Sequence, residues 1–427
     1  MMRPDAGQYF YLTTQGCKVN QYESQAIREL WMHWGARETV DPCQADFILI
    51  NSCAVTERAI LDLEKLVRSF ASLKPKAKIL VLGCAVEADT NRILSLPGVD
   101  LAISQQDKRF LNQESTSGHK FSSLHIADYN RARAVIKVQD GCSHGCTYCI
   151  IPATRGPSVS RLPEEILAEV RQLLQAGLRE LTLCGINLRH YGRDLHPKID
   201  LWDLVTHLDN ELRSQWTGRA RIRLSSLEPG DLHPKTLETL ANCSLVCPHL
   251  HLSLQSGSPQ ILKRMGRGHY GPEQVFDFLD SLSHIWPMFG LGADIITGFP
   301  GETENLFQET LEVVTRLPLS YAHIFPYSER PGTPAATFPD TIPNHLRRER
   351  AKTLRHRVQI SRNKFLQTLL KVSPMHVVLE AKGAGMNEFY IECQVQGQAL
   401  PGRNLLPVTP LEITKNGLCV GVLGEGS

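Results

Sequence analysis

The sequence lacks any uninterrupted apolar run approaching the roughly 18 residues that a membrane-spanning helix needs. Its first residues, 1–16, contain no apolar core of the kind found in a secretory signal. We therefore expect a cytoplasmic protein with no membrane partner. The 12 cysteines are too few for a disulfide scaffold. In the cytoplasm, clustered cysteines are more often metal ligands or catalytic groups than disulfides.

A strong excess of either charge is also missing. The 46 basic and 44 acidic residues leave a formal net charge of +2, which indicates no class of partner by itself. There is no fixed-period repeat and no low-complexity tract. Hydrophobic residues make up 42% of the chain and charged residues 21%, which excludes a disordered, collagen-like or coiled-coil protein. At roughly 150 residues per domain, 427 residues predict two or three domains.

The first part, residues 7–115, alternates short apolar runs with segments of helical periodicity. Strands that alternate with helices are typical of a parallel sheet covered by helices. We predict such an α/β domain, followed by a polar linker at residues 112–130. The predicted strands are Tyr9–Thr13, Phe47–Ile50, Ile79–Leu82 and Val99–Ile103, and the predicted helices are Tyr22–Trp34 and Glu57–Phe70.

The second part, residues 128–366, continues the strand-then-helix pattern without the signature of a long β-hairpin. Six strand candidates are too few for a closed eight-stranded barrel, so we predict a partial (β/α)6 barrel. In this architecture the loops after the carboxyl ends of the strands build the functional site. The predicted strands are Val135–Val138, Leu181–Leu183, Arg221–Leu224, Leu250–Leu254, Ala293–Ile296 and Ala322–Phe325.

The third part, residues 368–427, has short strand candidates separated by glycine and proline. They predict a small β-barrel, a fold that often binds nucleic acid but does not establish that function alone. The candidates are His376–Glu380, Glu388–Cys393 and Leu411–Ile413.

The strongest local signal is the stretch GCSHGCTYC, in which Cys142, Cys146 and Cys149 have the spacing C-x3-C-x2-C. Three thiolates within one loop can bind a single metal centre. A fully ligated [4Fe–4S] cluster uses four thiolates, so three would leave one iron open to another ligand. Zinc with His144 as a fourth ligand is an alternative, and unliganded thiols are another.

Three dispersed cysteines each follow one of the first three apolar runs: Cys17 in TQGC, Cys53 in NSC and Cys84 in LGC. Because the carboxyl ends of parallel strands meet at one edge of a sheet, we expect these thiols to come together. A single cysteine is more often a small buried residue, but the equivalent placement of all three favours a second three-thiolate site. We interpret the other six as packing residues: Cys43, Cys184, Cys243, Cys247, Cys393 and Cys419.

The C-x3-C-x2-C motif, with Tyr148 before its last cysteine, resembles the signature of radical S-adenosylmethionine (SAM) enzymes. Together with the three dispersed cysteines, it resembles the methylthiotransferases of that superfamily. The C-terminal part is similar to the TRAM domain of RNA-modifying enzymes. The resemblance covers nearly the whole chain, including VQDGCSHGCTYCIIPATRGPSVSR, RIRLSSLEP, HLHLSLQSGSPQILKRM, DIITGFPGET and FPYSERPGTPAA.

The stretch GCKVNQYES around Cys17 resembles one branch of this family. That branch modifies N6-threonylcarbamoyladenosine at position 37 of tRNA, next to the anticodon. The isopentenyladenosine branch usually reads closer to GCQMN, and the branch acting on a ribosomal-protein aspartate reads closer to GC-x-KN. The first branch fits best, and the other two remain alternatives.

The resemblance implies two [4Fe–4S] clusters. The C-x3-C-x2-C cysteines would hold the cluster that binds and reductively cleaves SAM to methionine and a 5′-deoxyadenosyl radical. The dispersed cysteines would hold an auxiliary cluster that presents sulfur, and a second SAM would supply the methyl group. A methylthio group then replaces the hydrogen at C2 of the modified adenine. The implied partners are a tRNA substrate, an electron donor such as flavodoxin or ferredoxin, and an unidentified sulfur source.

Residues in loops after the barrel strands are candidate SAM contacts, because such loops reach the site and glycine permits close approach. Each could instead be an ordinary loop residue with no ligand contact. We assign no catalytic side chain, since the chemistry belongs largely to the cofactors. The candidates are Tyr148, Gly185, Asn187, Ser226, Glu228, Gln255 and Gly298.

The segment 347–364 has eight basic residues against one acidic residue, a local charge of +7. Its apolar residues recur at helical spacing, so the basic side chains can occupy the other faces of a helix. Such a helix could follow the phosphates of tRNA. The alternative is a solvated outer helix of the barrel.

A protein of a different class, a zinc-stabilised RNA-binding protein without catalysis, is also compatible with the cysteines. Two sites of three thiols each argue against it, because structural zinc sites are normally closed by four ligands.

Overall fold

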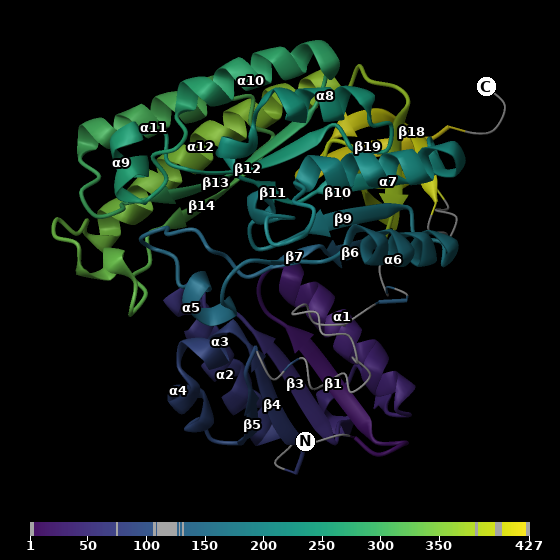
Figure 1. Cartoon of the computed structure of the whole chain (residues 1–427), viewed down its shortest axis with the longest axis vertical. Coiled ribbons are helices and arrows are strands. Elements are labelled where there is room, and N and C mark those ends of the chain that lie inside the picture. The colour runs from purple at the N-terminus through teal and green to yellow at the C-terminus, as the bar shows by residue number, and fades with distance from the viewer. Residues whose placement is uncertain are drawn as a thin grey trace.

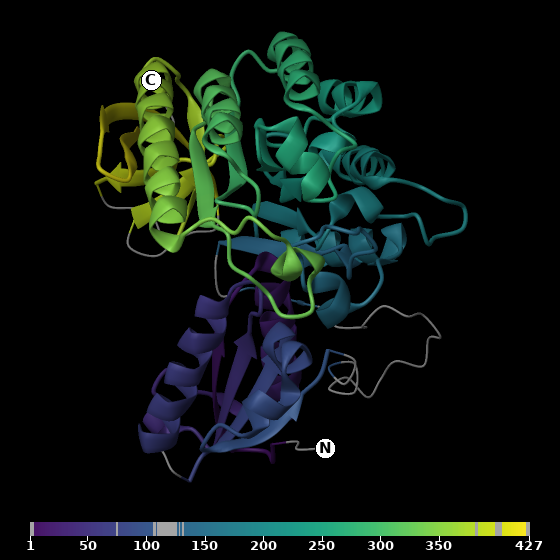
Figure 2. The ribbon, with the colours of Figure 1, turned by 90° about the vertical axis from the view of Figure 1, so that its left-hand side faces the viewer.

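The computed structural model describes residues 4–73, 76–105, 108, 126–127, 129, 132–380, 383–397 and 404–423. Most of the predicted linker at residues 112–130 lies outside these ranges. The N-terminal sheet lies at one end of the molecule and the partial barrel at the other (Figure 1). Figure 2 shows the C-terminal barrel against the flank of the partial barrel, beside α12 (Asn344–Leu369). Within the described ranges, no helix combines the length and apolarity needed to cross a membrane.

The N-terminal part is a five-stranded parallel sheet with the order β2-β1-β3-β4-β5. Helix α1 covers one face with Ile27 and Trp31, and α2 covers the other with Leu63 and Val67. The four predicted strands and two predicted helices are confirmed, whereas β2, α3 and α4 are too short to show in the sequence pattern. The elements are β1 (Tyr9–Thr14), α1 (Lys18–His33), β2 (Arg37–Glu38), β3 (Phe47–Ser52), α2 (Glu57–Leu73), β4 (Lys78–Gly83), α3 (Cys84–Ala88), α4 (Thr90–Leu94) and β5 (Val99–Ile103).

The central part is a partial barrel made of two parallel sheets, β10-β9-β6 and β11-β12-β13-β14. A parallel bridge between Ile222 and Val246 lies between β10 and β12, and Ser225 separates β10 from β11. All six predicted strands are confirmed. The strands are β6 (Arg133–Lys137), β9 (Glu180–Cys184), β10 (Arg221–Leu224), β11 (Ser226–Leu227), β12 (His249–Gln255), β13 (Gly290–Thr297) and β14 (Tyr321–Pro326).

Helices cover the outside of this barrel (Figure 1). Their buried faces join the strands in one hydrophobic core, which holds Ile166, Leu208 and Leu354. A short antiparallel ribbon, β7 (Gln139–Asp140) with β8 (Val159–Ser160), flanks the cysteine loop. The helices are α5 (Ile151–Arg155), α6 (Pro163–Gln175), α7 (Leu201–Trp216), α8 (Pro234–Asn242), α9 (Pro259–Arg264), α10 (Pro272–Ile285), α11 (Glu304–Arg316) and α12.

The C-terminal part is a closed five-stranded barrel, which confirms the predicted fold. The predicted strand Glu388–Cys393 is wrong in its position, because Glu388–Tyr390 form a turn. The Asn387 side chain accepts hydrogen bonds from the amides of Phe389 and Ile391 and so holds that turn. The strands are β15 (Met375–Leu379), β16 (Ala384–Asn387), β17 (Glu392–Gln396), β18 (Leu405–Ile413) and β19 (Gly417–Val422).

A buried ionic cluster attaches this small barrel to the partial barrel. Glu180 on β9 is fully buried and pairs with Arg221 and Arg223 on β10. The same guanidinium groups donate to carbonyl oxygens of the small barrel, at 2.8 Å to His376 and 2.9 Å to Asn387. The cluster therefore orients one domain on the other.

The basic segment is helical, as predicted, but two of its arginines face inward. Arg347 donates to the carbonyl of Tyr327, and Arg350 pairs with Glu302 at 3.0 Å. Both side chains are buried and make their contacts inside the partial barrel, so they are not part of a basic outer surface. Lys352 remains exposed, so the proposed phosphate-binding face is smaller than the sequence suggests.

Candidate functional site

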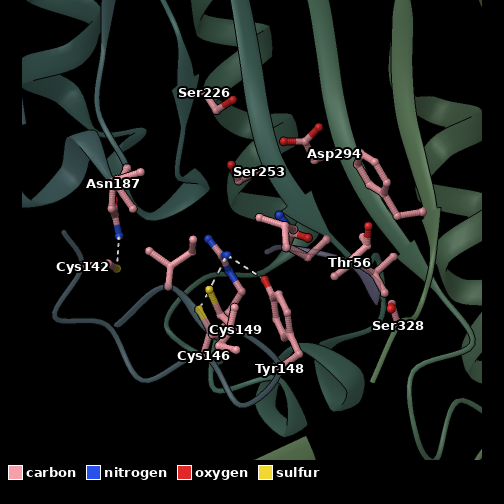
Figure 3. Close-up of a pocket in the computed structure, with 18 of the residues that line it drawn as sticks. Thr56, Cys142, Cys146, Tyr148, Cys149, Asn187, Ser226, Ser253, Asp294 and Ser328 are labelled. Carbon is pink, nitrogen blue, oxygen red and sulfur yellow. Dashed lines mark hydrogen bonds between the residues drawn. The ribbon is translucent and has the colours of Figure 1, made fainter. Parts of the chain in front are cut away.

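The C-x3-C-x2-C loop connects β7 to α5 beside the carboxyl ends of the barrel strands. Cys142, Cys146 and Cys149 all line a cavity of about 430 Å³ there. Figure 3 shows Cys146 and Cys149 together, while Asn187 directs its amide toward Cys142. The loop thus lies where parallel barrels build their sites.

Two side chains direct N–H groups at these sulfurs. Asn187 Nδ2 lies 3.8 Å from Cys142 Sγ, and Arg267 Nη1 lies 3.8 Å from Cys146 Sγ. Burial raises the pKa of Cys146 to about 12 and that of Cys149 to about 11. The thiols of Cys146 and Cys149 therefore stay protonated until a metal centre displaces their protons.

The three dispersed cysteines lie at one edge of the N-terminal sheet. Cys17 is the N-cap of α1, Cys53 follows β3, and Cys84 begins α3 directly after β4. Burial chiefly, together with the nearby thiols of Cys84 and Cys17, raises the pKa of Cys53 to about 11. The structure thus brings together the three positions that the strand pattern selects.

Gly16 makes this approach possible. Its φ of +110° is a backbone conformation that favours glycine. A Cβ atom at this position would lie 2.9 Å from the Cβ of Cys53. Any larger residue would displace a cysteine of the dispersed set.

The two cysteine sites face each other. Cys17 lines the same cavity as the cysteines of the loop, and Cys84 is close enough to Cys149 to raise its pKa. Sulfur held at one site and a ligand bound at the other would therefore meet in one cavity.

The spacing of the sulfurs tests which metal centre fits. Tetrahedral zinc, with Zn–S bonds of 2.3 Å, needs sulfurs about 3.8 Å apart. Among the described residues, no three cysteine sulfurs all lie within 4.8 Å of one another. His144, the fourth zinc ligand considered above, instead places Nε2 at 3.1 Å from the carbonyl oxygen of Gly266. The donor sets fit a larger cluster held by three thiolates better than a single zinc ion.

Five of the seven predicted SAM contacts line the cysteine cavity. Glu228 is held there by His269 at 2.5 Å and Arg267 at 3.4 Å. Gln255 adopts a φ of 63°, which turns the chain at the end of β12. Their contact with SAM stays a prediction. The five are Tyr148, Asn187, Ser226, Glu228 and Gln255.

The two predicted glycines lie elsewhere. Gly185 lines a neighbouring cavity of about 530 Å³. Gly298 lines neither cavity; a Cβ there would lie 2.3 Å from the Cγ of Arg347. Its packing against α12 explains the glycine without a ligand.

The neighbouring cavity extends from Cys17 into the barrel. It shares Cys17, Ser226, Ser253 and Asp294 with the cysteine cavity, so the two spaces adjoin. In Figure 3, Ser226, Ser253 and Asp294 lie across the cavity from Cys146 and Cys149.

An ionic network between the cysteine sites was not predicted from the sequence. Arg155 pairs with Glu23 at 2.9 Å, and Lys108 and Lys137 pair with the same buried carboxylate. Burial alone would raise the pKa of Glu23, but these three cations hold it well below its ordinary value. Glu23 and Arg155 both lie in stretches that carry the family resemblance, yet 132 residues separate them, so no local pattern indicates their pairing.

Comparisons with known proteins agree with this architecture. Residues 136–314 match the model of the radical SAM superfamily, and residues 9–104 match the uncharacterized protein family UPF0004. A solved radical SAM methyltransferase from Kitasatospora setae superposes with a TM-score of 0.58 at 11% identity, covering 77% of each chain. The fold and the cysteine loop define a radical SAM protein.

Similar curated proteins identify the family within the radical SAM superfamily. A threonylcarbamoyladenosine tRNA methylthiotransferase of Bacillus subtilis is 34% identical over 358 residues, covering 80% of this chain and 78% of the relative. A tRNA-2-methylthio-N6-dimethylallyladenosine synthase of Clostridium botulinum is 32% identical over 366 residues, covering 81% and 80%. The chain belongs to the radical SAM methylthiotransferase family, which confirms the predicted resemblance.

The chain is therefore an enzyme of sulfur and methyl transfer that uses SAM and two [4Fe–4S] clusters. When bound, these groups supply the radical chemistry and the sulfur. The protein's own contribution is a cavity lined by the three cysteines of the loop and by Cys17 of the dispersed set, with polar side chains on its far wall. The alternative of a zinc-stabilised binding protein without catalysis is not supported.

Proposed function

We propose that this enzyme converts N6-threonylcarbamoyladenosine at position 37 of tRNA to its 2-methylthio derivative. The Bacillus subtilis relative carries this substrate in its name, as does a Thermotoga maritima relative that is 31% identical over 408 residues. The stretch GCKVNQYES supports the same branch.

The polar side chains among the mixed lining of the neighbouring cavity are the observation in favour of this substrate. Arg133, Ser225, Ser253 and Asp294 all line the space that extends from Cys17 into the barrel. A threonylcarbamoyl group presents a carboxylate, a hydroxyl and N–H groups that such side chains can bind. A hydrocarbon substituent would offer no hydrogen bond to hydroxyl groups such as those of Ser225 and Ser253, and a buried hydroxyl left without a partner costs ~1–3 kcal/mol.

Isopentenyladenosine is the second candidate. The name of the Clostridium botulinum relative refers to this type of nucleoside. Its identity to this chain, 32%, is close to the 34% of the Bacillus subtilis relative. Apolar residues that would suit a hydrocarbon substituent include Val55 and Ile186, which line both cavities, and Phe325, which lines the cysteine cavity. Methylthiolation of a ribosomal-protein aspartate has no comparable support among these observations.

In this proposal the cysteines of the loop hold the cluster that binds SAM, and the dispersed cysteines hold the auxiliary cluster. The three parts of the chain divide at the predicted bounds, 7–115, 128–366 and 368–427. The cavity residues contact SAM, the C-terminal barrel binds tRNA, and a flavodoxin or ferredoxin supplies electrons in the cytoplasm.

The test is mass spectrometry of tRNA nucleosides from a host that lacks its own methylthiotransferases but retains both precursor nucleosides. Expression of the protein should produce 2-methylthio-N6-threonylcarbamoyladenosine, and a Cys53→Ala variant should not. Appearance of the isopentenyl product alone would refute the proposed substrate but would still support methylthiolation of tRNA as the reaction. Absence of both products from cells whose protein carries two clusters would place the substrate outside these tRNAs.

A further inference from the structure

Among the residues that the structure describes, Lys18 has no carboxylate partner, and it lies at the mouth of the barrel. It is the first residue of α1, directly after Cys17, and it lines the cavity of about 530 Å³. Within the described ranges, no carboxylate lies within 4.0 Å of its ammonium group. Arg133, the other cation of that lining, pairs with Glu380 at 2.8 Å.

The charge of Lys18 acts across the cavity on the barrel strands. Burial lowers the pKa of His323 on β14; the charge of Asp294 opposes this shift, and His251 and Lys18 add to it. Burial also lowers the pKa of His249 on β12, and Arg223, His251 and Lys18 add to that shift. Lys18 lines this cavity together with Ser253 on β12 and Asp294 on β13, so it lies beside the barrel strands although its helix belongs to the N-terminal sheet.

The acidic groups of the cavity are already paired. Asp294 Oδ1 lies 3.1 Å from His251 Nε2, and Glu380 pairs with Arg133. Among the described lining residues, an anionic group from outside the protein would thus find one unpaired cation, Lys18, next to hydroxyl groups such as that of Ser253. Charge-assisted hydrogen bonds to carboxylates are among the strongest that a lysine makes.

We propose that Lys18 binds the carboxylate of the threonylcarbamoyl group and so selects this nucleoside over uncharged ones, an inference that rests on the proposed function. Lys18 is a specificity-determining residue in this arrangement. Because Cys17 lines both cavities, a nucleoside whose carboxylate contacts Lys18 lies beside the dispersed cysteines.

The carboxylate of SAM is a second anionic group that the ammonium group of Lys18 could bind. Lys18 does not line the cysteine cavity, whose wall includes Cys142, Cys146 and Cys149. The position of Lys18 therefore favours the substrate, and a measurement of SAM affinity separates the two sources.

The experiment uses the full chain with both clusters, prepared anaerobically. Binding and single-turnover methylthiolation are measured with three anticodon stem-loop RNAs, which carry the threonylcarbamoyl nucleoside, its carboxyl methyl ester or isopentenyladenosine. The wild-type enzyme should prefer the free acid over the ester by about tenfold or more, as expected for a hydrogen bond to a charged group. Lys18→Gln should lose that preference, and Lys18→Arg should retain most of it.

Lys65→Gln is the matched control, because Lys65 is an exposed lysine of the same sheet domain. Iron content and SAM affinity should be unchanged in Lys18→Gln. Retention of the full acid-over-ester preference in that variant would overturn the inference about Lys18 while leaving the substrate intact. Weakened SAM binding with an unchanged preference would also overturn it. If the wild-type enzyme modifies only the isopentenyl RNA, the proposed function itself fails, and the role of Lys18 fails with it.

Discussion

Arg155 Nε donates a hydrogen bond to the sulfur of Cys84 at 3.2 Å. A residue of α5, directly after the cysteine loop of the barrel, therefore contacts a residue of the other cysteine site. The same guanidinium pairs with Glu23 at 2.9 Å and with Asp140 at 2.8 Å. Because a guanidinium is planar and donates in fixed directions, these bonds set the position of one cysteine site relative to the other.

Replacement of Arg155 by Gln should lower both stability and the potential of the auxiliary cluster. Loss of one partner from a buried ionic network typically costs ~3–5 kcal/mol. Loss of a positive charge near a cluster favours its oxidised state, so the reduction potential should become more negative. Thermal unfolding and a redox titration followed by electron paramagnetic resonance measure the two effects. Arg155→Lys keeps the charge, so the potential of the auxiliary cluster in this variant should lie closer to that in the wild type. Equal potentials in all three proteins would show that Arg155 does not act on this cluster.

Single substitutions at the two cysteine sites should separate SAM cleavage from sulfur transfer. Cys146→Ala should abolish SAM cleavage and lose the iron of one cluster, while most RNA affinity remains. Cys53→Ala should also lose the iron of one cluster but still cleave SAM, without forming a methylthio product. Iron analysis, chromatography of the cleavage products and RNA binding test the pair. SAM cleavage retained by Cys146→Ala would disprove the first assignment.

The fold was predictable wherever apolar runs alternate with helical segments. Buried parallel strands such as β3, in which all six residues are buried, show as continuous apolar runs. The small barrel was harder, because β16 (sequence AGMN) lacks such a run and Asn387 bends the chain before β17. A turn made by one side chain leaves no periodic signal.

The candidate site likewise has a part that was predictable from the sequence and a part that was not. Cys17, Cys53 and Cys84 were predictable because each follows a strand, and parallel strands end at a common edge. The pairing of Glu23 with Lys108 and Arg155 was not, because these residues are 85 and 132 positions apart. Only the assembled domains bring such charges together.

A Gly16→Ala substitution should selectively impair the auxiliary site. An added Cβ would lie 2.9 Å from the Cβ of Cys53, and alanine does not readily adopt a φ of +110°. We expect the iron of one cluster to be lost, with SAM cleavage retained. The control is Gly218→Ala, because Gly218 also has a positive φ but no atom within 4 Å of the added Cβ. Equal iron content in the two variants would mean that the close approach to Cys53 has no consequence.

The Glu180 cluster should make attachment of the C-terminal barrel sensitive to acid. Burial alone would raise the pKa of Glu180, but Arg223, Arg221 and Arg133 together hold it well below its ordinary value. A carboxyl whose pKa is lower in the folded state stabilises the protein fully above its unfolded pKa of about 4.3, and this contribution is lost as the pH falls below that value.

Glu180→Gln should therefore lower the melting temperature at pH 7, where loss of a buried ionic partner costs ~3–5 kcal/mol. The difference from the wild type should shrink at pH 4 and below, because protons increasingly bind the unfolded wild-type chain. Anaerobic melting curves at both pH values measure this change, and Glu238→Gln, at an exposed glutamate of α8, serves as the control. In hydrogen exchange at pH 7, the amides of β15 and β16 should also lose protection in Glu180→Gln, because Arg221 then lacks the carboxylate that orients it toward His376 and Met386. A difference in melting temperature that stays constant with pH would show that Glu180 acts through packing alone.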